Sequence, residues 1–177
     1  MVVTNFGGIE ETLRYLDWQL QAYALAAAMP PGTAKNDVQI ALGAPRTAYF
    51  GKHRILSVIL RGIDTGLAHP SVVAALGANA TALTAQCQVL KATAQDLGKR
   101  RNALAHAAIG VSGASLVRSM GLLAQPQTVN PLDDQKLTTD IGAFRTELGA
   151  FINKLTQALP FRDHNQVTFF EPVEVVI

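Results

Sequence analysis

The chain has 177 residues, of which 49% are hydrophobic and 16% are charged. This length is sufficient for one domain with its own core, and the low aromatic share of 6% together with the many alanines favours packed helices over a β-sandwich. A formal net charge of +2 is too small to indicate nucleic-acid binding through overall charge, so any such function must depend on local clusters of Lys and Arg.

The first expected element is an amphipathic helix that ends at Pro30-Pro31-Gly32. Apolar residues recur there at spacings of four and three, which predicts one buried stripe: Ile9, Leu13, Leu16, Leu20 and Tyr23. The polar stretch at 35–37 and the Gly-Ala-Pro sequence at 43–45 indicate a loop, with room for a short helical turn at 38–42.

A second helix is expected over about 47–63, with its buried side formed by Tyr49, Leu56, Ile59, Leu60 and Ile63. Basic residues gather around it: Arg46, Lys52, His53, Arg54 and Arg61. Phosphate contacts come mainly from Lys and Arg, so Lys52 and Arg54 are candidate phosphate ligands, although a solvated helix face is the favoured explanation when this helix is taken alone. Gly62, Gly66 and Pro70 break the pattern and predict a loop that holds His69.

The third helix is expected over about 79–105, followed by a short β-like insert. Leu83, Leu90, Leu97 and Leu104 lie seven residues apart, which predicts a bundle seam, and Cys87, Ala94 and Arg101 fall four positions after the first three leucines. The segment after His106 contains β-prone pieces around a Ser-Gly turn and predicts a hairpin or an irregular crossover.

The last helix has the clearest signals in the chain. Asn130-Pro131 is typical of a helix start, Pro160 ends the pattern, and a four-three repeat runs between them: Leu137, Ile141, Phe144, Leu148, Phe151, Leu155 and Leu159. The sequence therefore predicts an all-α fold, a four- to five-helix up-and-down bundle with a short β-like insert before the last long helix. Residues 1–160 form the bundle domain and residues 161–177 an extended C-terminal tail.

The single cysteine, Cys87, excludes an intrachain disulfide framework and a multi-cysteine zinc site, and it fits a reducing compartment. The apolar run at 22–29 follows Glu10, Glu11 and Asp17 rather than a basic start, so it is not expected to be an export signal. No apolar run approaches the length of a membrane span. We expect a cytoplasmic protein without a membrane partner.

The segment 99–106, Lys-Arg-Arg-Asn-Ala-Leu-Ala-His, is the one place where cations, an amide and an imidazole crowd together. On a regular helix Lys99, Asn102 and His106 share a face that points away from the leucine seam. Arg101 falls on the seam side, where burial requires either a carboxylate partner or an opening. Gly98 is a candidate kink that would change these faces.

The order Arg101-Asn102, three spacers and His106 resembles the motif of the HEPN (higher eukaryote and prokaryote nucleotide-binding) superfamily. The resemblance implies a bundle of four or five helices with the motif in its later part, and it covers roughly residues 9–159 at the level of architecture. The chain departs from the pattern at Ala107, where relatives often have glycine, and in lacking a nearby tyrosine.

Many members of that family are metal-independent endoribonucleases, so the resemblance implies catalytic roles for Arg101, Asn102 and His106. His106 would move a proton, Arg101 would hold the phosphate, and Asn102 would orient either group. Lys99, Arg100, Lys52 and Arg54 are then the expected RNA contacts, with no metal and no cofactor.

One imidazole does not conveniently serve as acid and base in a single step, so a homodimer is expected to supply the second one, ahead of His53 of the same chain. The resemblance also suggests the toxin of a toxin–antitoxin pair with a nucleotidyltransferase-like antitoxin. Two alternatives remain open. In the first, the chain would be a non-catalytic interaction or nucleotide-binding module. In the second, the basic residues of the segment 99–106 would only stabilise the negative end of a helix dipole.

Overall fold

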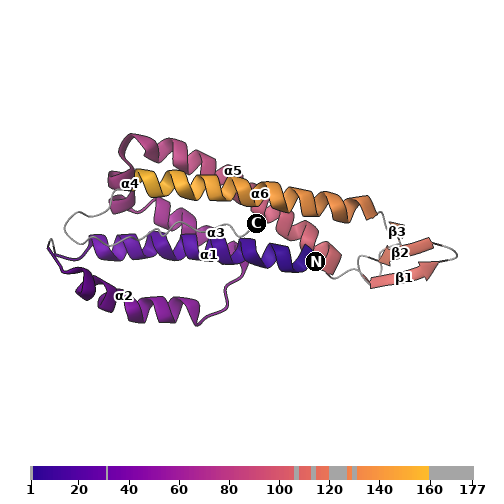
Figure 1. Cartoon of the computed structure of the whole chain (residues 1–177), viewed down its shortest axis with the longest axis horizontal. Helices are drawn as coiled ribbons and strands as arrows, with labels where there is room; N and C mark the ends of the chain where they lie inside the picture. The colour runs from indigo at the N-terminus through magenta and orange to yellow at the C-terminus, as the bar shows by residue number, and fades with distance from the viewer. Residues whose placement is uncertain are drawn as a thin grey trace.

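The fold was analysed in a computed structural model that describes residues 2–30, 32–105, 108–112, 115–119, 127–128 and 131–159. The helices are α1 (Val2–Ala27), α2 (Lys35–Phe50), α3 (Leu56–Leu67), α4 (Pro70–Leu76), a 3-10 turn (Gly77–Asn79), α5 (Ala80–Ala105) and α6 (Pro131–Ala158). Successive long helices run back and forth along the longest axis (Figure 1), so the predicted helical bundle is confirmed. The predicted tail at 161–177 lies outside the described residues.

The main core lies between α1, α3, α5 and α6. The three predicted stripes all face it: every residue of the α1 and α6 stripes is buried, as are the seam residues of α5 from Leu83 to Leu97. Phe6, Phe144 and Phe151 are the largest fully buried side chains of this core. The four-three periodicity therefore predicted the buried faces of the long helices correctly, because each helix has one apolar side to bury.

Helix α2 packs on another side of α1 and forms a second, smaller core. Trp18, Ala22 and Ala26 of α1 meet Val38, Leu42 and Tyr49 there, with Met29 and Phe50 partly buried against them. Helix α1 thus carries two apolar faces, and Figure 1 shows α2 lying alongside it, apart from α5 and α6.

The predicted loop at 35–37 is wrong, and the predicted second helix at 47–63 is divided between α2 and α3, although Tyr49, Ile59, Leu60 and Ile63 are buried as predicted. Residues 35–50 are helical, with Pro45 inside the helix, and the chain leaves the helix at 51–55 before α3 begins. Arg14 of α1 explains the break, because its Nη2 donates to the carbonyl oxygens of Phe50 (2.6 Å) and Lys52 (2.9 Å). These contacts satisfy carbonyl groups that a continuing helix would have paired internally.

Gly62 and Gly66 do not end a helix as predicted but lie inside α3, one turn apart, against α1. A Cβ atom on Gly62 would lie 2.3 Å from Asp17 Oδ1, and one on Gly66 would lie 2.6 Å from Leu20 Cβ. Both positions therefore lack a side chain because the two helices approach closely there. Gly98 similarly faces Leu56 and Phe6, and α5 continues through it to Ala105.

Between α5 and α6 the chain forms a small antiparallel sheet of β1 (Ala108–Ser112), β2 (Ser115–Ser119) and β3 (Gln127–Thr128), in the order β1-β2-β3. Gly110 pairs with Val117, and Val117 pairs with Thr128. The sheet extends beyond the end of the helices (Figure 1). Within the described part of the chain, no helix is both long and apolar enough to cross a bilayer.

Candidate functional site

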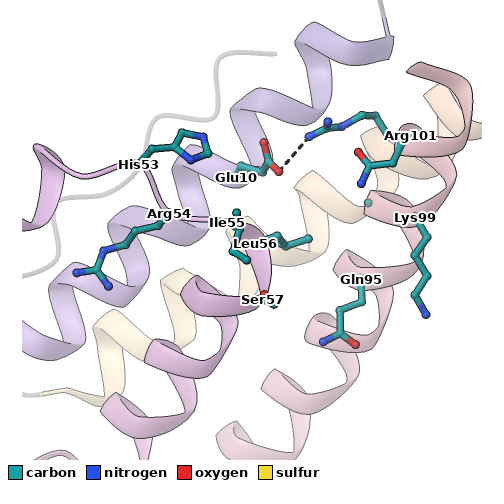
Figure 2. A pocket seen from close by; sticks show the side chains of 11 residues that line it. Glu10, His53, Arg54, Ile55, Leu56, Ser57, Gln95, Lys99 and Arg101 are labelled. Carbon is teal, nitrogen blue, oxygen red and sulfur yellow. Dashed lines mark hydrogen bonds and ion pairs between the residues drawn. The ribbon is translucent and has the colours of Figure 1, made fainter. Parts of the chain in front are cut away.

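A cleft of about 760 Å³ opens between α1, the start of α3 and the C-terminal part of α5. Its walls come from three distant parts of the sequence (Figure 2): Glu10 from α1, the segment from His53 to Ser57, and Gln95, Gly98, Lys99, Arg101 and Asn102 from α5. We call it the α1–α3–α5 cleft. It contains most of the described residues that the sequence singled out for function.

On the α5 wall, Gln95, Lys99 and Asn102 form an exposed stripe. Their spacing of four and three places them on one face of the helix, while Ala94 and Leu97 of the same turns are buried in the core. The face that was predicted for Lys99 and Asn102 is therefore directed away from the seam. His106, the third predicted member of this face, lies outside the described residues.

Arg101 enters the cleft from the seam side and is paired with a carboxylate. Its Nη2 donates to Glu10 Oε1 at 3.0 Å, and its guanidinium lies 5.0 Å from the centre of the Phe6 ring. The side chain keeps 21% of its surface exposed and that of Glu10 keeps 35%. Arg101 Nε is buried and has no hydrogen-bond partner in the described part of the protein. The arginine thus combines the two expected solutions, a carboxylate partner and an opening.

On the facing wall, the linker at 51–55 brings His53 and Arg54 to the cleft. His53 is exposed, whereas Arg54 is half-buried, with its guanidinium 4.1 Å from the centre of the Tyr49 ring. Figure 2 shows that the Arg54 guanidinium points away from Arg101. The charge of Arg54 therefore contributes to the field of the cleft more than to direct contacts within it.

Two of the predicted phosphate contacts lie elsewhere. Arg100 donates to Asp140 of α6 at 2.7 Å and lies 3.6 Å from Asp96, so it connects α5 to α6. Lys52 is exposed on the linker and is not part of the cleft wall; its carbonyl group receives the hydrogen bond from Arg14.

The linker is held in place by a buried polar cluster beneath it. Asp17 is fully buried and accepts hydrogen bonds from Tyr49 Oη (2.6 Å) and Gln21 Nε2 (2.6 Å). Burial raises the pKa of Asp17, and these two hydrogen bonds and the nearby charge of Arg54 oppose that rise. Burial and the Asp17 carboxylate both raise the pKa of Tyr49. The cluster connects α1 to the end of α2, which fixes where the linker begins.

The sequence analysis missed Glu10, Ser57 and Gln95 as cleft residues and ranked His53 low. Glu10 is 91 positions from Arg101 and looks like any polar residue of an amphipathic helix, so nothing local marks it. His53 does have a signal, since it lies within the basic cluster around Arg54.

The lining of the cleft has more basic than acidic side chains, with Lys99, Arg101 and Arg54 against Glu10. Arg54 also lies near the carboxyl group of Asp17, so its charge acts on that buried group as well as on the cleft. Low-dielectric walls strengthen such a field within a concave surface. Among the described residues, no group of three or more His, Cys, Asp or Glu side chains is arranged to hold a metal ion.

Comparisons with protein-family models, with curated proteins and with solved structures found no match to this chain.

Proposed function

We propose that the protein is a HEPN-like, metal-independent endoribonuclease or RNA-binding protein that acts in the α1–α3–α5 cleft. One observation supports this most strongly. Arg101 and Asn102 of the motif, together with the neighbouring Lys99, line the same open cleft as the basic linker residues His53 and Arg54, which the sequence places almost 50 positions earlier. A chance motif on a helix surface has no reason to face a second basic segment.

The chemistry follows from the residue types. Lys99 and Arg101 offset the charge of a phosphodiester, and the Arg101 fork offers several donors in one plane. Asn102 supplies an amide for the phosphate or the ribose. His106 transfers a proton near neutral pH. Ile55, which is 60% exposed at the rim, offers an apolar surface to a ribose or a base.

The proposal includes the partners that the resemblance implies. A homodimer that brings two motifs together would extend the cleft, and a nucleotidyltransferase-like antitoxin would make the protein the toxin of a pair in the cytoplasm. These partners follow from the motif and the bundle architecture rather than from the cleft, so they need separate tests of oligomeric state and of neighbouring genes.

A second candidate is a non-catalytic interaction or nucleotide-binding module with the same cleft. The Arg101–Glu10 ion pair favours it, because an arginine that is already paired stabilises the contact between α1 and α5 without any substrate. The two candidates differ in outcome: the module binds RNA or nucleotides and leaves them intact.

Cleavage of a labelled RNA by the purified protein distinguishes the two. The parent is expected to cut the RNA without added metal, and His106→Ala is expected to lose about 10²-fold or more of the rate, since proton transfer by a side chain contributes that much. His69→Asn is the matched control, because His69 caps α4 by accepting from the Ser71 backbone N–H and asparagine keeps an acceptor at an N-cap. Equal rates in parent and His106→Ala, or none in either, would remove the enzymatic function.

A further inference from the structure

Arg54 lines the α1–α3–α5 cleft, but its guanidinium is held outside it. The guanidinium lies 4.1 Å from the centre of the Tyr49 ring, and its charge acts on the buried carboxyl group of Asp17. Figure 2 shows it turned away from Arg101, whereas the linker segment that carries it is part of the cleft wall. Arg54 therefore has two alternative anionic partners, the Asp17 carboxylate and an anion bound in the cleft.

Resting on the proposed function, which gives the cleft a phosphodiester ligand, we propose that Asp17 regulates the affinity of the cleft by holding Arg54 outside it. Asp17 is then a positioning residue, because its negative charge draws the guanidinium toward Tyr49. When that charge is removed, the guanidinium turns into the cleft and binds a phosphate beside Arg101. The cleft thus has two states that differ by one cation, and the charge of Asp17 sets their proportions.

The contacts of Arg54 suit a reversible arrangement. Its Nε is buried and has no hydrogen-bond partner in the part of the chain that the structure describes. Arg14 and Arg100, by contrast, each donate to an oxygen, at 2.6 Å and 2.7 Å. A ring face attracts the guanidinium but offers no acceptor to the N–H donors that lie in its plane. A phosphate supplies acceptors, so the turn into the cleft exchanges a ring contact for charge-assisted hydrogen bonds.

Asp17 and the linker backbone stay in place while the Arg54 side chain moves. Asp17 is fully buried, and its two oxygens accept from Tyr49 Oη and Gln21 Nε2, each at 2.6 Å. Arg14 fixes the start of the linker by donating to two of its backbone carbonyl groups. The rearrangement therefore involves one side chain with several rotatable bonds and needs no movement of a helix.

Charged and titratable groups reach the surroundings of Asp17 from α1, α2 and the linker: Arg14, Tyr49 and Arg54. Helix α3 meets the carboxylate with Gly62, which has no side chain. Arg14 is engaged with the linker carbonyl groups, and Tyr49 stays neutral because burial and Asp17 raise its pKa. Arg54 is therefore the group that can respond by moving when the charge of Asp17 changes.

The sign of the pH dependence follows from the burial of Asp17, which raises its pKa. As pH falls through the raised pKa, Asp17 gains a proton and loses its attraction for Arg54, so the affinity of the cleft for a phosphate is expected to rise. By linkage, a phosphate that draws Arg54 into the cleft raises the pKa of Asp17 further, and binding takes up protons.

The test measures binding of a short fluorescein-labelled 2′-O-methyl RNA by anisotropy at pH 8. Asp17→Asn is expected to bind about 3- to 10-fold more tightly than the parent, since charge-assisted hydrogen bonds outweigh the ring contact that is lost. In an Arg54→Gln background, Asp17→Asn is expected to have no effect on the affinity. Asp64→Asn is the matched control. It changes the net charge equally, at a carboxylate that pairs with Lys91 outside the cleft wall, and is expected to bind as the parent.

Asparagine fills the space of Asp17, and the Tyr49 hydroxyl, which also donates to the Arg14 carbonyl oxygen at 3.2 Å, can accept from its amide. Urea unfolding checks that the variant is folded. A second measurement does not need this variant: as pH is lowered from 8 to the acid limit of folding, the parent is expected to gain more affinity than Arg54→Gln. Other groups that gain protons in acid are the same in both proteins.

Three results would overturn the inference while leaving the proposed function in place. They are an unchanged or weaker affinity of folded Asp17→Asn, an increase that persists in the Arg54→Gln background, and equal gains in acid by the parent and Arg54→Gln. If the parent binds no RNA, the proposed function and this inference both fail.

Discussion

Gly62→Ala tests the close contact between α1 and α3 that positions the cleft linker. The new Cβ would lie 2.3 Å from Asp17 Oδ1, 2.5 Å from Oδ2 and 2.6 Å from Cγ. An ordinary contact needs 3.4 Å or more, so Asp17 or α3 must move by about 1 Å. Asp17 is fully buried and held by two hydrogen bonds of 2.6 Å, so it has no open space to enter.

Two opposing effects determine whether Gly62→Ala raises or lowers the free energy of unfolding. In an unobstructed helix interior, alanine in place of glycine stabilises by about 0.5–1 kcal/mol. Forcing an extra methyl group into a packed site costs about 1–3 kcal/mol, and displacing a hydrogen-bonded carboxylate adds about 1.5–3 kcal/mol per bond lost. We therefore expect a net loss of about 2–3 kcal/mol in the free energy of unfolding, or roughly 5–10 °C in Tm for a chain of this size.

The assay is urea unfolding followed by circular dichroism, with two comparisons. Gly142→Ala on α6, where a Cβ meets nothing within 4 Å, is expected to stabilise by about 0.5–1 kcal/mol. In an Asp17→Ala background the obstruction is gone, so Gly62→Ala is expected to become neutral or stabilising, which a double-mutant cycle measures. A single Gly62→Ala variant as stable as the parent would refute the described packing of α1 on α3.

Two further predictions concern buried titratable groups. Because burial raises the pKa of Asp17, the folded protein binds a proton there that the unfolded chain releases above the usual value of 3.8. The contribution of this group to stability therefore falls as pH rises from that value through the raised one, and Asp17→Asn is expected to gain stability relative to the parent over that window in urea titrations at stepped pH. A difference that does not change with pH would contradict this. Burial raises the pKa of Cys87 to about 11, with the Asp64 carboxylate adding to the rise. A disulfide reagent at pH 8 is expected to modify Cys87 only as the protein unfolds, and rapid modification of the folded protein would show that the thiol is accessible.

The sequence predicted those parts of the fold that depend on periodicity within one helix. The stripes of α1, α5 and α6 were correct because the four-three spacing is a local property that packing then uses. Prediction from the sequence failed where a residue that is distant in the chain decides the local structure. The break after Phe50 depends on Arg14, some 36 positions earlier, and Gly62 and Gly66 signalled a close helix contact rather than a turn.

The same distinction applies to the candidate site. Lys99, Arg101 and Asn102 could be selected from the sequence because they are crowded on one helix, and they do line a cleft. The other wall could not be predicted from the sequence. Glu10 meets Arg101 only through the packing of α1 on α5, and His53 reaches the cleft only because α2 ends at Phe50 and the linker follows. The role of His106 remains a prediction from the motif, since that residue lies outside the described part of the chain.

The most direct test of the proposed function is the chemistry of the RNA ends produced by the parent protein and by Arg101→Ala without added metal. Our account predicts 2′,3′-cyclic phosphate and 5′-hydroxyl ends from the parent, identified by mass spectrometry of a short defined RNA, and a loss of both from the variant. Ends with 3′-hydroxyl and 5′-phosphate groups, or the same products at the same rate from both proteins, would contradict it.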